Sequence, residues 1–439
     1  MSRIMVSMLF VLAMMPLAQA RQVRVGVAKV EITPPGPIWL SGYAARTKPS
    51  EGVAHKLFAK ALAIEDGGRG RLIVVTTDLI GLPRSVTEPV SASLAKQYGL
   101  DRSRLLFNSS HTHAGPVVTP NLMTMYFLTE EQKRAVNVYR DQLVEHLNTV
   151  VGAALRDLAP AKLSIAHGTV GFSHNRRTKG GPVDQDVPTI VAHTSDGKLK
   201  AVLFGYACHN TTLGGDYYQV SGDYAGYAQT ELERLQPGVT ALFLLLCGGD
   251  QNPNPRGAVA HAEEYGKALA SEVNRVLPAA KPLALDLRTA FQITELAFAP
   301  HTREQFESES KDENKFKASR AREMLRAYDE RRPIRRTPYP VQAVRFAKGV
   351  ALLALGGEVV VDYSLRAKKE YADTDLIVAG YSNDVMCYIP SLRVLREGGY
   401  EGETSMIYYG QPGKFSEEVE ETVFRSVRQV LSQVGVKSK

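Results

Sequence analysis

The feature that most limits how this 439-residue chain can fold is the alternation of short apolar runs with longer amphipathic stretches. Short apolar runs predict buried strands, and apolar residues at three- to four-residue spacing predict helices. Strands are predicted at residues 23–32, 56–64, 72–77, 105–108, 201–207, 242–247 and 349–355, and helices at residues 85–98, 129–158, 223–235, 360–371 and 416–434. This interleaving predicts an α/β fold with mixed β-sheets flanked by helices.

No internal repeat or low-complexity tract divides the chain, so a single large domain over residues 21–439 is expected. The apolar share of 44% and the charged share of 23% are typical of a folded protein. The charge-dense stretch 301–336 is expected to form a solvated helical excursion or a lid.

The first twenty residues predict a signal peptide. Arg3 precedes an apolar run that ends at Leu17, and Ala18-Gln19-Ala20 matches the small-x-small cleavage pattern. We therefore expect export to the periplasm or beyond, with no later transmembrane segment and contact with a membrane surface left open.

The charge and the cysteines exclude other classes. The formal net charge of +7 is spread thinly, and no dense basic run with aromatic residues predicts a nucleic-acid partner. Cys208, Cys247 and Cys387 are too few for a disulfide framework and lack the spacing of a zinc-thiolate site, so they are expected to be small buried residues.

Polar motifs follow three of the predicted strands, at residues 108–116, 208–213 and 248–255. In open α/β sheets, ligands bind beyond the carboxyl ends of the strands. These three segments are therefore the expected functional site.

The first motif contains His111-Thr112-His113. On an extended segment the two imidazoles would point to the same side and could converge on one metal ion or substrate. His209, at the end of another apolar run, is a plausible third imidazole. Glu358 follows Gly356-Gly357 where a strand ends, and a carboxylate buried there requires a metal or cation partner. Alternatively, Glu358 serves the amino terminus of the next helix.

These motifs resemble the neutral/alkaline ceramidase family. The segments that carry the resemblance, in the family's order, are NSSHTHAGP (residues 108–116), SGDYAGYAQTELE (221–233), CGGDQNPNP (247–255), GGE (356–358), SNDVMCYIP (382–390) and GGYEGETS (398–405). The resemblance implies a zinc-dependent hydrolase that uses a metal-activated water on an amide bond of a small-molecule or lipid N-acyl substrate, such as an N-acyl sphingosine. It implies zinc ligands at His111, His209, Glu358 and Tyr388.

The resemblance also implies roles for residues beside the metal. His113 and Tyr400 would lie at the scissile amide, and Arg176 would bind the substrate. Asn252 occupies the position of a family serine, which excludes a serine nucleophile there and leaves an amide donor for the substrate carbonyl. The immunoglobulin-like carboxyl-terminal domain of full-length ceramidases is not expected in this chain.

Three alternatives remain open. A zinc hydrolase of the same fold could act on a non-lipid amide or an ester. An inactive relative could bind a ligand through the same site. Iron or another transition metal could replace zinc, because ligand types alone do not select the metal.

Overall fold

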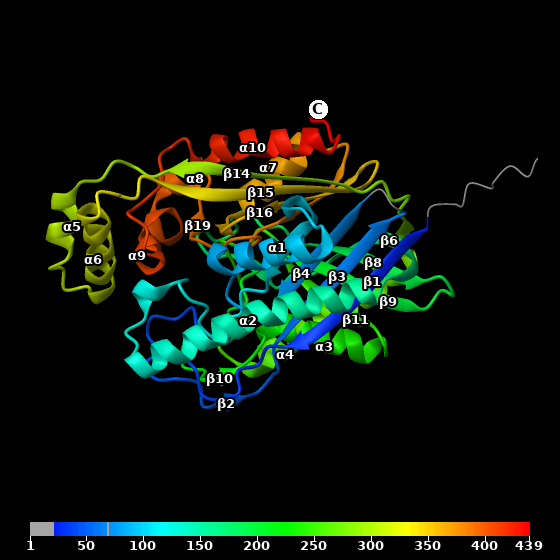
Figure 1. Ribbon diagram of the computed structural model, residues 1–439, viewed down its shortest axis with the longest axis horizontal. Helices are drawn as coiled ribbons and strands as arrows, with labels where there is room; N and C mark the ends of the chain where they lie inside the picture. Colours follow the sequence, from blue (N-terminus) through cyan, green and yellow to red (C-terminus); the bar gives the residue numbers. More distant parts are fainter. Residues whose placement is uncertain (1–21, 68–69) are drawn as a thin grey trace, which may run out of the picture.

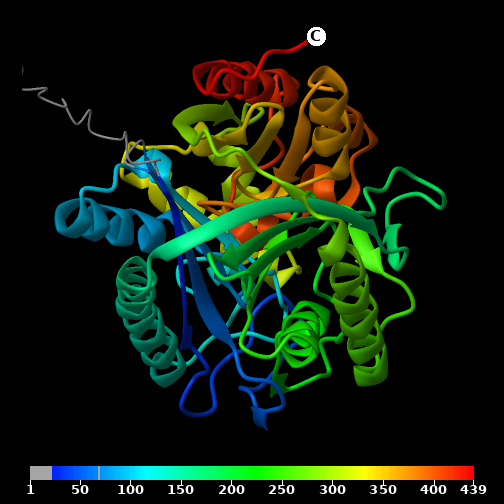
Figure 2. The ribbon, with the colours of Figure 1, turned by 90° about the vertical axis from the view of Figure 1, so that its right-hand side faces the viewer.

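The computed structural model describes residues 22–67 and 70–439, and the predicted signal peptide lies outside these residues (Figure 1). The fold is mixed α/β, as predicted. Three sheet faces surround a shared apolar core, and a pair of helices covers the outside of each face (Figure 2).

Two of these three faces are the core-facing sides of the two halves of one nine-stranded sheet, counted among the described residues. Its strand order is β11-β9-β8-β6-β1-β3-β4-β5, and β13 pairs with β6 off this path. The β4–β5 and β9–β11 pairs are parallel. The strands are β1 (Val23–Glu31), β3 (Phe58–Asp66), β4 (Arg71–Thr77), β5 (Leu105–Ser109), β6 (Ala159–Thr169), β8 (Asp186–Thr194), β9 (Leu199–Tyr206), β11 (Thr240–Leu245) and β13 (Lys281–Pro282).

The third face is a four-stranded sheet in the order β14-β15-β16-β18, in which β16 and β18 are parallel. Its strands are β14 (Arg288–Ala297), β15 (Arg336–Ala347), β16 (Val350–Leu355) and β18 (Asp375–Ala379). In the charge-dense stretch before β15, the predicted helical character is confirmed by α5 (Arg303–Glu309) and α6 (Lys315–Asp329).

The shared core explains the continuous apolar runs of the sequence. Leu106 and Leu244 from the nine-stranded sheet meet Ile377 from the four-stranded sheet in one buried cluster. The outer faces of the same strands pack against helices, so strands such as β3 and β16 are buried on both faces. The covering pairs are α1 (Arg84–Tyr98) with α2 (Glu130–Arg156), α3 (Asp223–Leu235) with α4 (Val259–Val276), and α7 (Val361–Glu370) with α10 (Val419–Gln433).

Strands β5, β11 and β18 come together at their carboxyl ends, and the side chain of Asn108 joins them. Its amide oxygen accepts a hydrogen bond from the backbone N–H of Leu245 (2.8 Å), and its Nδ2 donates to the Leu245 carbonyl (3.1 Å). The same Nδ2 donates to the carbonyl of Gly380 (2.9 Å) and to the Ser382 hydroxyl (3.1 Å). One buried amide thus continues the backbone pairing between the two sheets.

Two further features bear on the predictions. Cys208, Cys247 and Cys387 are free and fully buried, as expected. Among the helices of the described residues, none has the length and apolar character needed to cross a bilayer.

Candidate metal centre

The three predicted strand-end motifs meet at one end of the shared core, together with two segments from the four-stranded sheet. His111 follows β5 and His209 follows β9, and both side chains are fully buried. Nδ1 of His111 lies 2.6 Å from the carbonyl of Ile80, and Nδ1 of His209 lies 2.7 Å from the carbonyl of Gly248. A carbonyl only accepts, so each Nδ1 donates, and in the neutral ring the lone pair is on Nε2.

The carboxylate and a phenol oxygen face those lone pairs. Oε2 of Glu358 lies 3.0 Å from Nε2 of His111 and 2.9 Å from Nε2 of His209. The Tyr388 hydroxyl lies 3.0 Å from Nε2 of His209. Glu358 begins β17 (Glu358–Val359) and Tyr388 begins β19 (Tyr388–Ile389), and the parallel pairing of these strands places the two residues side by side.

Glycine is required immediately before Glu358. Gly357 has φ +72°, and a β-carbon there would lie 2.6 Å from the Ile389 side chain. Any larger residue would be strained in this left-handed conformation and would separate β17 from β19. The glycine pair noticed in the sequence therefore positions the carboxylate.

The charges at this cluster call for a cation. Burial, with the Arg176 cation adding to it, lowers the pKa of His209 to about 4, so its imidazole is neutral at pH 7. Burial alone would raise the pKa of Glu358, but the charge and hydrogen bonds of His111 and His209 hold it well below its ordinary value. Nε2 of each imidazole thus faces an ionised carboxylate at hydrogen-bond distance. A divalent cation would satisfy these nitrogen and oxygen donors together, so the residues fit a zinc site.

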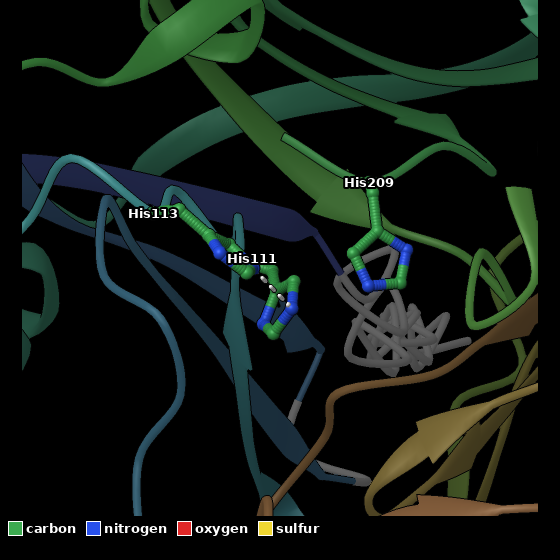
Figure 3. Close-up of side chains that lie close together, drawn as sticks. All are labelled: His111, His113 and His209. Carbon is green, nitrogen blue, oxygen red and sulfur yellow. Dashed lines mark hydrogen bonds between the residues drawn. The ribbon is translucent and has the colours of Figure 1, made fainter. Parts of the chain in front are cut away.

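His113 joins the cluster by a route that differs from the expected extended segment. His111 has φ +64°, a left-handed conformation, so the segment is not a strand and the alternation argument for it is wrong. The turn still brings Nε2 of His113 within 3.1 Å of Nε2 of His111. Nitrogen atoms of His111, His113 and His209 all lie within 4.8 Å of one another, and this trio could itself hold a metal ion (Figure 3).

The surroundings of His113 hold its ring in place. Nδ1 of His113 is buried without a partner among the described residues, and a β-carbon on Gly42 would lie 2.3 Å from it. The Tyr43 ring packs at 4.8 Å between centroids. Burial, followed by the nearby histidines, lowers the pKa of His113 well below its ordinary value, so this imidazole is also neutral.

Two tyrosines that sequence reasoning missed hold the Glu358 carboxylate. The Tyr409 hydroxyl donates to Oε1 of Glu358, and the Tyr381 hydroxyl lies 3.4 Å from Oε2. The Tyr381 ring also packs on His111 at 4.6 Å between centroids. Partners that orient a ligand contribute strongly to metal affinity. Tyr409 lies in the short helix α9 (Met406–Tyr409), and no spacing pattern in the sequence indicates it.

Arg176 links the predicted substrate-side residues to the centre. Its guanidinium donates to the Tyr388 hydroxyl (3.0 Å), to Oδ1 of Asn252 (3.3 Å) and to Oε1 of Glu401 (2.6 Å). It also lies over the ring of Tyr400, 5.6 Å from the centroid. Glu401, which was not predicted, balances the charge of Arg176.

Asn252 and Tyr400 both contact Arg176, and each comes from a different sheet region. Asn252 lies in β12 (Gln251–Pro253), which pairs with β7 (Ser173–Asn175). Because its Oδ1 accepts from Arg176, its Nδ2 group is the remaining donor. Tyr400 begins a π-helical turn (Tyr400–Thr404), is 40% exposed, and packs against Tyr388 at 5.4 Å between centroids.

All eight predicted site residues therefore lie in one connected cluster. The structure brings together the four proposed ligands. His113 lies beside His111, and Asn252 and Tyr400 contact Arg176, which donates to Tyr388. Their individual roles remain predictions. The full set is His111, His113, Arg176, His209, Asn252, Glu358, Tyr388 and Tyr400.

The chain is similar to known proteins in sequence and in fold. Residues 23–275 match the family model described as neutral/alkaline non-lysosomal ceramidase, N-terminal. The neutral ceramidase of Pseudomonas aeruginosa is 24% identical over 256 residues, covering 53% of this chain and 37% of that protein. The neutral ceramidase of Drosophila melanogaster is 24% identical over 262 residues, covering 53% of this chain and 36% of that protein. The match thus spans little more than a third of these relatives.

The solved structures extend the likeness of the fold to nearly the whole chain. The crystal structure of neutral ceramidase from Pseudomonas aeruginosa superposes with a TM-score of 0.75 over 95% of this chain and 75% of that chain, at 18% identity. A structure of ceramidase complexed with C2 gives a TM-score of 0.74 over 95% and 76%, also at 18% identity. The likeness includes the four-stranded sheet, which the family model does not reach.

Proposed function

Because this chain belongs to the neutral/alkaline non-lysosomal ceramidase family, we propose that it is a zinc-dependent hydrolase that cleaves the amide bond of an N-acyl compound. The observation that carries the proposal is the convergence of the His111 and His209 imidazoles and the Glu358 carboxylate within 3.0 Å. His111, His209, Glu358 and Tyr388 would hold the ion. Zinc bound there would supply Lewis acidity, which lowers the pKa of a bound water to about 7.

The residues beside the ligands would hydrogen-bond and orient the substrate carbonyl. The Nδ2 group of Asn252 and the hydroxyl of Tyr400 are donors carried by two residues that contact Arg176. A donor that hydrogen-bonds the developing oxyanion contributes about 3–4 kcal/mol to the transition state. His113 is neutral and carries one proton, which it can share with the carbonyl oxygen or the leaving amine. Arg176 would orient Asn252 and Tyr388, and it would bind a polar part of the substrate.

A line of aromatic rings supports an apolar acyl group as part of the substrate. From the Tyr400 ring, centroids follow at 6.3 Å to Tyr408, 5.3 Å to Phe316 and 5.7 Å to Phe127, which is 48% exposed. We call these four residues the aromatic file. Aromatic rings bury large apolar area. The file connects the surface with the proposed scissile position, as an acyl chain would require.

A specific observation favours a substrate other than ceramide. Asn252 stands at the position of the family serine, so the donor facing the carbonyl is an amide and not a hydroxyl. A hydrolase of the same fold that acts on a non-lipid amide or an ester is therefore the second candidate. We also propose export, which rests on the first twenty residues.

Metal analysis of the purified protein tests the first part of the proposal. We expect about one zinc per chain in the native protein, and loss of that zinc in His111→Ala, because each ligand of a four-ligand site is needed for tight binding. A folded native protein without metal would contradict the proposal and favour an inactive, ligand-binding relative. Stoichiometric iron in place of zinc would change the cofactor but retain the site.

A substrate panel tests the second part. N-acyl sphingosines, short N-acyl amines and matched esters would be compared with the zinc-loaded protein, with His111→Ala as the inactive control. Cleavage of N-acyl sphingosines would support a ceramidase. Cleavage of only short amides or esters would identify the second candidate.

A further inference from the structure

A cavity of about 530 Å³ lies beside the proposed catalytic residues and has no part in the mechanism above. The β7–β12 ribbon and the following turns form its walls, and Arg176 and Asn252 line both this cavity and the edge of the metal cluster. A substrate whose amide lies at Asn252 would therefore extend directly into the cavity. Its chemistry indicates what that part of the substrate carries.

The cavity is cationic. Arg176, Lys179 and Arg256 line it, and among the described lining residues there is no aspartate or glutamate. Arg176 is balanced by Glu401. Within residues 22–67 and 70–439, no ion pair involves Lys179 or Arg256, so both charges remain available to a ligand.

A neighbouring cavity shows that this excess of charge is local. That cavity, of about 730 Å³, shares Arg176, Asn252 and Arg256 but also contains Glu397 and Glu401. Both glutamates pair with Arg177 there. The two cavities thus differ in their electrostatic character, because cations line both but carboxylates line only the second.

The cavity wall that carries Lys179 is held in place before any ligand binds. Oδ1 of Asn175 accepts the backbone N–H groups of Arg177 (3.0 Å) and Thr178 (3.1 Å), and its Nδ2 donates to the carbonyl of Pro182 (2.9 Å). A β-carbon on Gly181 would lie 2.8 Å from the Asn175 side chain, so glycine permits this close approach. A wall fixed in this way lowers the ordering cost of ligand binding.

We propose that this cavity is an anion subsite and that the substrate is an N-acyl amide whose amine side carries a carboxylate or a phosphate. The inference rests on the proposed function, since it assigns the substrate class of the same site. The aromatic file would hold the acyl chain on the Tyr400 side, and Lys179 and Arg256 would bind the oxyanion on the Asn252 side. A neutral sphingoid alcohol would leave both cations without a partner.

Matched substrates test the proposal. N-dodecanoylglycine would be compared with N-dodecanoylglycinamide, and N-dodecanoyl-ethanolamine phosphate with N-dodecanoyl-ethanolamine, so each pair differs only in the anionic group. We expect kcat/KM to be at least about tenfold higher for an anionic member, which is the effect of one charge-assisted hydrogen bond. The preferred pair identifies carboxylate or phosphate as the natural group. Added salt should reduce the preference, because the cavity is open to solvent.

Variants assign the preference to these residues. Lys179→Gln combined with Arg256→Gln should raise KM for the anionic substrate about tenfold and leave kcat/KM for its neutral partner unchanged. Arg332→Gln removes an exposed charge elsewhere and should change neither. Equal kcat/KM for anionic and neutral substrates in the wild type, or an anionic preference that survives the double substitution, would overturn the proposal.

A binding measurement separates this inference from the proposed function. If the zinc-loaded protein cleaves none of the four substrates and no N-acyl compound of the panel above, the proposed function fails. Calorimetry with N-dodecanoylglycine and with N-dodecanoyl-ethanolamine phosphate then tests the cavity directly. Binding of one of these ligands by the wild type, with loss of at least about tenfold in affinity in the double variant, supports the subsite. Absence of binding of both ligands by the wild type refutes it.

Discussion

The residues of the metal cluster come from two regions, and the family model matches only one of them. The nine-stranded region, residues 23–282, supplies His111, His209 and Asn252, and the family model matches almost all of it. The four-stranded region, residues 288–433, supplies Glu358 and Tyr388 and lies beyond the family match. The first region contributes the imidazoles and the second contributes the carboxylate. Neither region alone has the donor set proposed for zinc, so the site exists only where the two meet.

The largest expected effect comes from removing one ligand from each region. His209→Ala and Glu358→Gln should both lose the zinc and lower kcat/KM by about 10³-fold or more, corresponding to about 4 kcal/mol of transition-state stabilisation. Zinc content by elemental analysis and hydrolysis of the best panel substrate would be measured together. Glu330→Gln, on an exposed turn, is the matched control for the loss of a carboxylate.

The result for Glu358→Gln decides whether the four-stranded region supplies a zinc ligand. If this variant keeps both zinc and activity, the metal is bound by His111, His113 and His209 alone. The proposal that both regions supply zinc ligands is then wrong. His113→Gln adds the converse test. It should keep the zinc but lose catalysis if His113 faces the substrate, whereas loss of zinc would make His113 a ligand.

The second largest effect is expected at the hydrogen bonds of Asn108, which connect the two regions. Asn108→Ala would leave the N–H and carbonyl of Leu245 and the carbonyl of Gly380 without their buried partner. Each unsatisfied buried group costs about 1–3 kcal/mol, so we expect a loss of at least about 3 kcal/mol in the free energy of unfolding. Denaturant titration measures it. Ser109→Ala, which removes one hydroxyl contact to Thr77, should cost only about 1 kcal/mol.

A small change in Asn108→Ala would show that the sheets are held together by the shared core alone. In that case the two regions would be joined by apolar packing, with the Asn108 amide as a minor contributor. A variant that unfolds in two separate steps would show instead that the regions have independent stability.

Asn252 and Tyr400, the two proposed oxyanion donors, provide a third comparison between the regions. Asn252→Ala, in the nine-stranded region, should lower kcat about 10²-fold, or about 2.7 kcal/mol, because one oxyanion donor is lost. Zinc content should not change, since the Asn252 side chain contacts Arg176 and Thr211 and no proposed ligand. Tyr400→Phe removes the donor from the other region. Asn148→Ala on α2 is the control. An unchanged kcat in Asn252→Ala would show that Asn252 does not stabilise the oxyanion.

The smallest effect is expected at an ion-pair network between the regions. His167 of β6 lies 2.8 Å from Asp186 of β8 and 3.0 Å from Asp375 of β18. Hydrogen bonds to Asp186 and then Asp375 raise the pKa of His167 from 6.5 to about 10. The folded state therefore binds the proton more tightly than the unfolded state. The resulting stabilisation is fully present below about pH 6.5 and is lost as the pH rises to about 10.

His167→Gln should accordingly lower the free energy of unfolding at about pH 6 by about 1–2 kcal/mol, a discounted value because the side chain is 35% exposed and screened by solvent. At about pH 10 the variant and the wild type should differ little. His146→Gln on α2 is the control for the loss of a histidine, because His146 has no ion pair within residues 22–67 and 70–439. An equal loss at both pH values would indicate packing and not charge.

Much of the fold was predictable from local patterns. Helix α3 coincides with the predicted range 223–235, and the strand ends before His111, His209 and Asp250 fall where the apolar runs stop. Strands β6, β8, β14 and β15 were not predicted. Charged and polar residues interrupt their apolar pattern, as in the edge strand β14, where only two positions are buried. Partner strands, not local sequence, stabilise these segments.

The sequence by itself determined the elements and the residue types at their ends, because hydrophobic periodicity is a local property. The resemblance of its motifs also singled out the four proposed ligands. Only the tertiary structure decided that Glu358 meets His111 and His209, that a left-handed His111 turns His113 into the cluster, and that Tyr409 and Tyr381 hold the carboxylate. These contacts join residues far apart in the chain. They depend on strand order and on the meeting of two sheets, which no local pattern of residues specifies.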